Sequence, residues 1–219
     1  MNENLIVDLE KAGIISATFR KLSPDKKERL YETALATFGG NVFDRVSLDM
    51  IADKAGISKG SLFQYFGYKE NLLGFVGEIF LDNYRIFWCK RTGSGHEIRS
   101  RERLRRFLEG PAEFREEHPV EADFLAKMLF ENSRELSNDF RRRIRDTERE
   151  HLTAIIRRGA RTAEIRQDIP PEIIAATVNV IMETITRYLY DARGKTKRFE
   201  KTADFKDILE KILFDGIRG

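Results

Sequence analysis

The chain has 219 residues, and its 39 lysines and arginines against 36 aspartates and glutamates give a formal net charge of +3. Its single cysteine excludes an intramolecular disulfide and a cysteine-cage zinc site. No apolar run approaches the roughly 20 residues that a membrane-spanning helix needs. The N-terminal segment does not resemble a secretory signal, because Asp8, Glu10 and Lys11 interrupt its apolar stretch. We therefore expect a cytoplasmic protein without a membrane partner.

Apolar residues recur at helical spacing along the chain, and no segment alternates them with the period of a strand. The low proline count and the many long charged side chains also favour helix. The sequence predicts an all-α protein of about nine helices that follow an N-terminal extension over residues 1–22. In chain order, the expected helices cover residues 23–38, 47–55, 58–66, 69–88, 98–116, 120–133, 138–162, 171–191 and 203–217.

The most informative pattern lies in residues 47–73, SLDMIADKAGISKGSLFQYFGYKENLL. Two short helices joined by a turn that contains a glycine form a helix-turn-helix. Gly56 permits a backbone turn that a side chain would resist, and the small Ala52 and Ala55 let the second helix approach closely. The sequence thus predicts a three-helix DNA-binding domain over residues 23–68.

The second helix of this motif has the side chains that a DNA groove requires. The expected packing leaves these residues facing outward: Lys59, Gly60, Ser61, Gln64 and Tyr65. In a helix-turn-helix, the N-terminal part of this helix meets base edges in the major groove. Gln64 can pair with adenine and Lys59 with guanine. Lysines that begin two neighbouring helices are expected to contact backbone phosphates: Lys26, Lys27 and Lys69.

Residues 23–73 resemble the DNA-binding domain of the tetracycline-repressor (TetR) family of bacterial transcription regulators. The resemblance lies in the small residues around Gly56, in the block Leu62-Phe63-Gln64-Tyr65-Phe66 and in the Lys69-Glu70 pair after it. It implies that these residues face DNA: Ser47, Lys59, Ser61, Gln64, Tyr65 and Lys69. Phe63 departs from the family, because many relatives have a tyrosine there whose hydroxyl contacts phosphate.

The resemblance also implies that residues 69–219 form a helical ligand-binding and dimerisation domain. Aromatic residues and a methionine could line an apolar cavity for a small ligand: Trp88, Phe107, Phe114, Phe124 and Met128. Ordinary core packing is the simpler interpretation for any one of these side chains.

The last two expected helices each carry a wide apolar face. In the resembling family, two such helices per subunit form a four-helix bundle, and a twofold dimer presents two DNA-binding domains to a palindromic operator. The residues expected at this interface are Val178, Ile181, Ile185, Leu209, Ile212 and Leu213. The alternative is that both faces are buried within one subunit.

Together these patterns predict a homodimeric transcriptional regulator, most simply a repressor that a small apolar ligand releases from double-stranded operator DNA. The alternative is a helix-turn-helix protein that acts through a protein partner and has no small-molecule effector. We do not expect an enzyme, because the sequence shows no nucleophile–base pair, carboxylate pair or metal cluster. No cofactor and no metal are expected.

Overall fold

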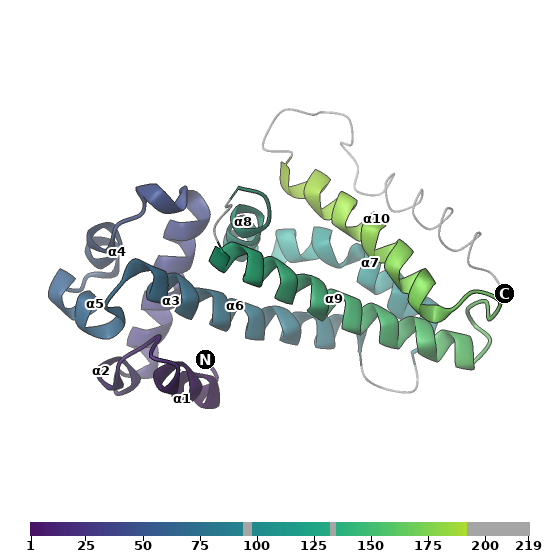
Figure 1. Cartoon of the computed structure of the whole chain (residues 1–219), viewed down its shortest axis with the longest axis horizontal. Coiled ribbons are helices and arrows are strands. Elements are labelled where there is room, and N and C mark those ends of the chain that lie inside the picture. The colour runs from purple at the N-terminus through teal and green to yellow at the C-terminus, as the bar shows by residue number, and fades with distance from the viewer. Residues whose placement is uncertain (94–97, 132–134, 192–219) are drawn as a thin grey trace. The chain divides into compact units, whose positions relative to one another are not determined.

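The computed structural model describes residues 1–93, 98–131 and 135–191. Within these ranges the regular structure is entirely helical (Figure 1), which confirms the all-α prediction. The expected helix over 203–217, with Leu209, Ile212 and Leu213, lies outside the described residues, as does the side chain of Ile185. None of the helices described is long and apolar enough to cross a membrane.

Ten α-helices and two short helical segments follow one another along the described chain. They are α1 (Glu3–Lys11), α2 (Ala17–Arg20), α3 (Pro24–Gly40), η1 (Phe43–Arg45), α4 (Leu48–Ala55), α5 (Lys59–Phe66), α6 (Lys69–Thr92), α7 (Ser100–Glu117), α8 (Pro119–Ala126), η2 (Lys127–Glu131), α9 (Glu135–Arg161) and α10 (Pro171–Asp191). The expected extension thus contains two helices, α1 and α2.

The chain divides into two compact units. The first unit contains residues 1–83 and 119–141, and the second contains residues 84–118 and 142–219. Helices α6 and α9 each contribute residues to both units. The expected domains, 1–22, 23–68 and 69–219, remain a prediction beside this division.

The N-terminal extension is part of the core of the first unit. Ile6, Leu9, Ile15 and Phe19 are all buried. The Phe19 ring lies between aromatic residues of α5 and α6, with its centroid 5.0 Å from those of both Phe66 and Phe75 in the described structure. Because these buried rings remove apolar surface from water, the extension and the expected DNA-binding helices share one core.

The same unit also contains residues from the middle of the chain. Helix α8 packs along α3. Its Phe124 has its ring centroid 5.3 Å from that of Phe80 and 5.7 Å from that of Phe140. All three of these side chains are buried, so α6, α8 and the start of α9 complete the apolar core around α3.

The second unit is built around a separate set of aromatic side chains. Trp88 is fully buried, and its ring centroid lies 4.6 Å from that of Phe107. Tyr84 and Phe114 meet edge to face at 5.2 Å. Helix α10 packs on α7 through a buried face that includes Ile174, Val178 and Met182.

Candidate nucleic-acid interface

Local backbone chemistry fixes the two helices of the predicted helix-turn-helix. The Ser47 hydroxyl caps α4 by accepting a hydrogen bond from the backbone N–H of Met50 at 3.1 Å. Gly56 then ends α4 with φ of 67° and ψ of 35°, a left-handed conformation that favours glycine. Ser58 caps α5 by accepting from the N–H of Ser61 at 3.0 Å. The sequence therefore places α4, the turn and α5 where the pattern predicts them.

Helix α5 divides its side chains between the core and the surface. Leu62 and Phe66 are buried and anchor the helix. The predicted DNA-facing residues lie on the remaining surface: Lys59, Gly60 and Gln64 are exposed, whereas Ser61 and Tyr65 are half-buried. The structure thus brings five predicted contact residues together on one short helix.

Lys59 has a partner that sequence reasoning missed. Its ammonium donates to Asp49 Oδ2 at 2.8 Å, and both side chains are largely exposed. Exposed ion pairs of this kind contribute little free energy, about 0.2–1 kcal/mol. A phosphate or base edge can therefore replace Asp49 at low cost. Asp49 lies ten residues before Lys59, and only the turn at Gly56 brings them together.

Phe63 is an exposed aromatic residue on the outer surface of α5. Its side chain is 58% exposed, although a phenylalanine is usually buried. It lies four residues after Lys59, so the two share one face of the helix. The sequence treats Phe63 only as a lost hydroxyl contact, whereas the structure presents its apolar ring at the surface that carries the polar contacts.

The three expected phosphate-binding lysines have different environments. Lys26 is exposed. Lys27 is only 3% exposed and its ammonium is directed to Glu3 Oε1 at 3.5 Å, so its position does not favour a phosphate contact. Lys69 donates to the carbonyl oxygens of Phe43 and Val46 at 2.9 and 2.8 Å. Those bonds tie the start of α6 to the segment before α4, a structural role that the sequence did not indicate.

The N-terminal extension contacts α5 directly. The backbone N–H of Ser16 donates to the carbonyl oxygen of Tyr65 at 2.9 Å. The Phe19 ring lies 5.8 Å from the Tyr65 ring and packs on Phe66. Sequence reasoning left the role of the extension open, and these contacts make it a support for α5.

The residues expected to line a ligand cavity are all buried core residues. Trp88, Phe107 and Phe114 belong to the second unit, whereas Phe124 and Met128 belong to the first. Each unit packs its own members against neighbouring rings. The structure therefore does not collect these five residues in one unit, and their ligand role stays a prediction.

Helix α10 exposes apolar side chains that were not among the expected interface residues. Val178 is 1% exposed and therefore contacts its own chain, and Ile181 is half-buried. Ile173 and Val180 are instead 57% and 65% exposed. They lie seven residues apart, about two helical turns, and so share one face of α10.

The second unit holds a half-buried carboxyl group, that of Glu148, whose pKa is raised. Tyr84 donates its hydroxyl hydrogen bond to Glu148 Oε1 at 2.6 Å. Burial raises the pKa of Glu148 to about 7, and Glu183 adds to this rise, while the Tyr84 hydrogen bond and Arg145 oppose it. This carboxyl group is thus partly protonated at neutral pH. No cluster of three or more metal-ligating side chains occurs among the described residues.

Comparison with known proteins agrees with this geometry. Residues 30–74 match the family model described as "Bacterial regulatory proteins, tetR family". Among curated proteins, none matches the chain. The matched segment includes the whole of α4, the turn and α5.

Solved structures extend the similarity beyond that segment. A putative TetR-family transcriptional regulator from Rhodococcus sp. is 20% identical over 88% of this chain and 98% of that chain, with a TM-score of 0.69. FadR from Bacillus subtilis, solved in complex with stearoyl-CoA, is 15% identical over 88% of this chain and 100% of that chain, with a TM-score of 0.69. The ketosteroid transcriptional regulator KstR2 of Mycobacterium tuberculosis is 21% identical over 91% of this chain and 97% of that chain, with a TM-score of 0.60.

At these identities the solved structures show a shared fold. The family match covers the helix-turn-helix that the geometry displays. Residues 30–74 are therefore a helix-turn-helix DNA-binding domain of the TetR family of transcriptional regulators, and the chain as a whole shares the fold of the solved TetR-family structures.

Proposed function

We propose that the protein is a homodimeric repressor that reads an operator through α5. The observation that carries this proposal is the capped α4–Gly56–α5 geometry, which leaves the polar side chains of α5 on its outer surface. The N-terminal part of such a helix fits the major groove of double-stranded DNA. The proposed DNA contacts are Lys26, Ser47, Lys59, Gly60, Ser61, Gln64 and Tyr65.

Phe63 adds an apolar element to this proposed contact surface. An exposed ring one turn from Lys59 can contact a thymine methyl group, which only A·T pairs present in the major groove. A family tyrosine at this position would instead bring a hydroxyl. We therefore include Phe63 among the side chains that select the operator.

The exposed apolar face of α10 supports dimerisation. Ile173 and Val180 remain exposed, and exposed apolar surface of this kind favours association. A twofold dimer would present two copies of α5 to the two halves of a palindromic operator. We assign Ile173 and Val180 to this interface because the burial of Val178 leaves it unavailable to a partner.

A small apolar effector is proposed for the second unit. FadR from Bacillus subtilis was solved with stearoyl-CoA, and KstR2 is described as a ketosteroid regulator. The stearoyl chain in the FadR complex is apolar, and we extend this class of ligand group to the second unit of this chain. A ligand changes operator affinity only if it prefers one spacing of the two α5 helices in the dimer over another. Action through a protein partner without such a ligand is the alternative.

The operator can be tested by selecting bound duplexes from a randomised pool. A dimer that binds DNA by sequence should enrich an inverted repeat, whereas a monomeric or non-specific DNA-binding protein should not. The enriched duplex then allows an effector test, in which stearoyl-CoA is added to the protein–DNA complex. Release of the duplex would support an acyl-thioester effector. No enrichment of any sequence would contradict the proposed function itself.

A further inference from the structure

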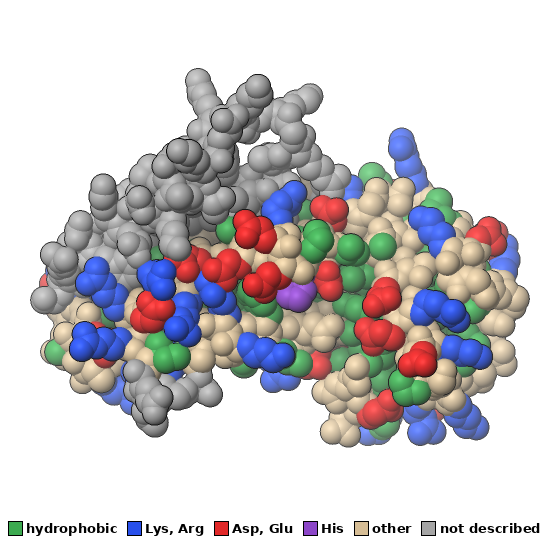
Figure 2. Space-filling model, turned by 180° about the vertical axis from the view of Figure 1, so that it is seen from behind, with side chains coloured by type: hydrophobic (Ala, Val, Ile, Leu, Met, Phe, Trp, Pro, Cys, Tyr) green, Lys and Arg blue, Asp and Glu red, His purple; other side chains and the backbone are tan. Residues whose placement is uncertain are grey.

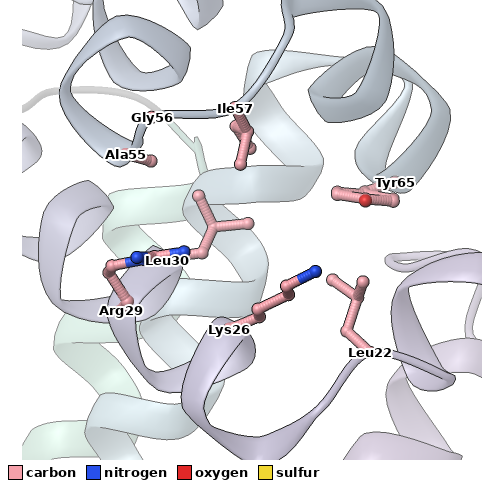
Figure 3. A pocket seen from close by; sticks show the side chains of 8 residues that line it. All are labelled: Leu22, Lys26, Arg29, Leu30, Ala55, Gly56, Ile57 and Tyr65. Carbon is pink, nitrogen blue, oxygen red and sulfur yellow. The ribbon is translucent and has the colours of Figure 1, made fainter.

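The first unit contains a pocket beside the proposed DNA-contact surface, and Lys26 and Tyr65 belong to both. It encloses about 140 Å³ and lies among the segment after α2, the start of α3, the turn after α4, and α5 (Figure 3). Cavities of about this size hold one benzene-sized molecule. Its lining consists of Leu22, Lys26, Arg29, Leu30, Ala55, Gly56, Ile57 and Tyr65.

The lining combines an apolar floor with two cations and a phenol. Figure 3 shows the Lys26 side chain extending into the space bounded by Leu30, Ile57 and Tyr65. Arg29 follows Lys26 by three residues on α3, so both can serve one ligand. The Tyr65 hydroxyl offers a neutral hydrogen-bond donor on the opposite wall.

Neither cation is paired within the described chain, although nearby cations are. Lys27, the residue between them, is directed to Glu3, and Arg20 pairs with Glu10. Lys59 pairs with Asp49. Lys26 and Arg29 form no side-chain ion pair or hydrogen bond with any described residue, and no acidic side chain lines the pocket.

From this juxtaposition we infer that the pocket binds a phosphate group, held by Lys26 and Arg29 with Tyr65 as a further donor. Arginine presents a planar fork that fits phosphate oxygens, and lysine adds a compact charge. The apolar floor of Leu22, Leu30 and Ile57 suits a short hydrocarbon body attached to that phosphate. The phosphate inferred here belongs to a small free molecule, since contact of Lys26 with the DNA backbone is already part of the proposed function.

An occupant would contact three parts of the DNA-binding domain at once. It would contact the start of α3, the turn at Gly56 and Ile57, and Tyr65 of α5. A small free molecule at this place would therefore compete with DNA or fix the orientation of α5. The binding itself does not depend on the protein being a repressor.

The test is a titration of the full-length protein with inorganic phosphate and with propyl phosphate, at constant ionic strength. Binding is followed through the backbone amide resonances of Gly56, Ile57 and Tyr65. We expect saturable shifts, with tighter binding of propyl phosphate because its chain covers the apolar floor. Lys26→Ala combined with Arg29→Ala should weaken the binding by about tenfold or more, because both charged donors are lost.

The matched control is Lys90→Ala combined with Arg161→Ala, which removes one lysine and one arginine from exposed positions outside the pocket. It should change the binding by less than about twofold, since remote surface charges act weakly. Leu22→Trp fills the pocket and keeps both cations, so it should also abolish the shifts. Equal losses from the two double variants would overturn the proposal.

A second arm repeats the measurement with a short mixed-sequence DNA duplex. If only the duplex shifts the pocket amides, the lining residues serve only the DNA contact already proposed, and the inferred small-molecule site is wrong. If the free phosphates shift them, the site binds small molecules. If neither probe shifts the pocket amides, the proposal is wrong. This holds even if the protein still enriches an inverted repeat from the randomised pool.

Discussion

The two units of this protein differ in how far their notable polar side chains are exposed to solvent. The first unit has a dense aromatic core and exposes its polar recognition side chains on α5. The second unit instead contains a half-buried carboxyl group, Glu148, which accepts a hydrogen bond from Tyr84 and has a raised pKa. Figure 2 shows that, away from the grey residues, charged side chains of both signs are spread over the visible face. Surface placement suits contact with a large polar partner such as DNA, whereas the half-buried Glu148 makes the stability of the second unit depend on pH.

The largest expected effect concerns the support that the extension gives to α5. Phe19→Ala removes a fully buried ring that packs on Phe66 and Phe75. We expect the free energy of unfolding to fall by about 3–4 kcal/mol, the usual cost of truncating a buried phenylalanine. Urea denaturation measures this loss. The control is Phe63→Ala, which truncates an exposed ring and should cost less than about 0.5 kcal/mol. Similar losses for both variants would remove the distinction between core and contact surface.

The second unit can be perturbed separately at Gly110 of α7. A Cβ atom at this position would lie 2.3 Å from the Trp88 ring, which is fully buried and cannot withdraw. Gly110→Ala should therefore reduce stability by about 2–3 kcal/mol through overpacking. Gly40→Ala is the control, because a Cβ there meets no atom within 4 Å. Thermal or urea unfolding compares the two, and an unchanged stability for Gly110→Ala would contradict the packing described around Trp88.

The half-buried carboxyl group of Glu148 gives the stability of the second unit a pH dependence of known sign. The pKa of Glu148 in the folded protein is raised to about 7. Between its ordinary pKa and about 7, the folded protein keeps a proton that the unfolded chain has lost. Stability therefore falls as the pH rises through this window and levels off above it.

Glu148→Gln should remove this dependence. The variant should gain about 1–2 kcal/mol relative to the wild type between about pH 5 and pH 8, because the side chain is partly exposed and the full shift is screened. Urea denaturation at both pH values measures the gain. Glu116→Gln changes an exposed carboxylate of α7 in the same unit and should leave the pH profile unchanged. A wild-type profile in Glu148→Gln would contradict the assignment.

The smallest expected effect concerns the ion pair between Asp49 and Lys59 on the proposed DNA-binding surface. Asp49→Asn removes the carboxylate that pairs with Lys59, so the affinity for a DNA duplex should rise by about two- to fivefold at low salt. Asp8→Asn is the matched control, since it removes an exposed carboxylate that pairs with Lys11 on α1. Fluorescence anisotropy measures both affinities. An equal gain from both variants would indicate a general charge effect and not a contact surface around Lys59.

The sequence predicted the helix-turn-helix because its signals are local. Ser47, Gly56 and Ser58 each act on backbone atoms within a few residues, so their effect can be inferred from order along the chain. The support from Phe19 and the carbonyl contacts of Lys69 could not be inferred in this way. They join residues that are more than twenty positions apart, and only the folded core brings them together.

The residues expected to line a ligand cavity could not be assigned from the sequence for a different reason. Aromatic residues such as Trp88 and Phe107 give the same sequence pattern whether they line a cavity or fill a core. The structure packs these two against each other. Val178 likewise has an apolar side chain that suits either a dimer interface or its own core. Apolar character alone does not indicate which neighbour covers a residue.

The central claim is that α5 selects DNA by sequence through its exposed polar residues. The most direct measurement compares the affinity for the enriched duplex with that for a scrambled duplex, in the wild type and in Lys59→Ala combined with Gln64→Ala. Loss of base contacts should lower this ratio by about tenfold or more, while Lys90→Ala, at an exposed position of α6, should leave it unchanged. An unchanged ratio in the double variant would contradict the claim.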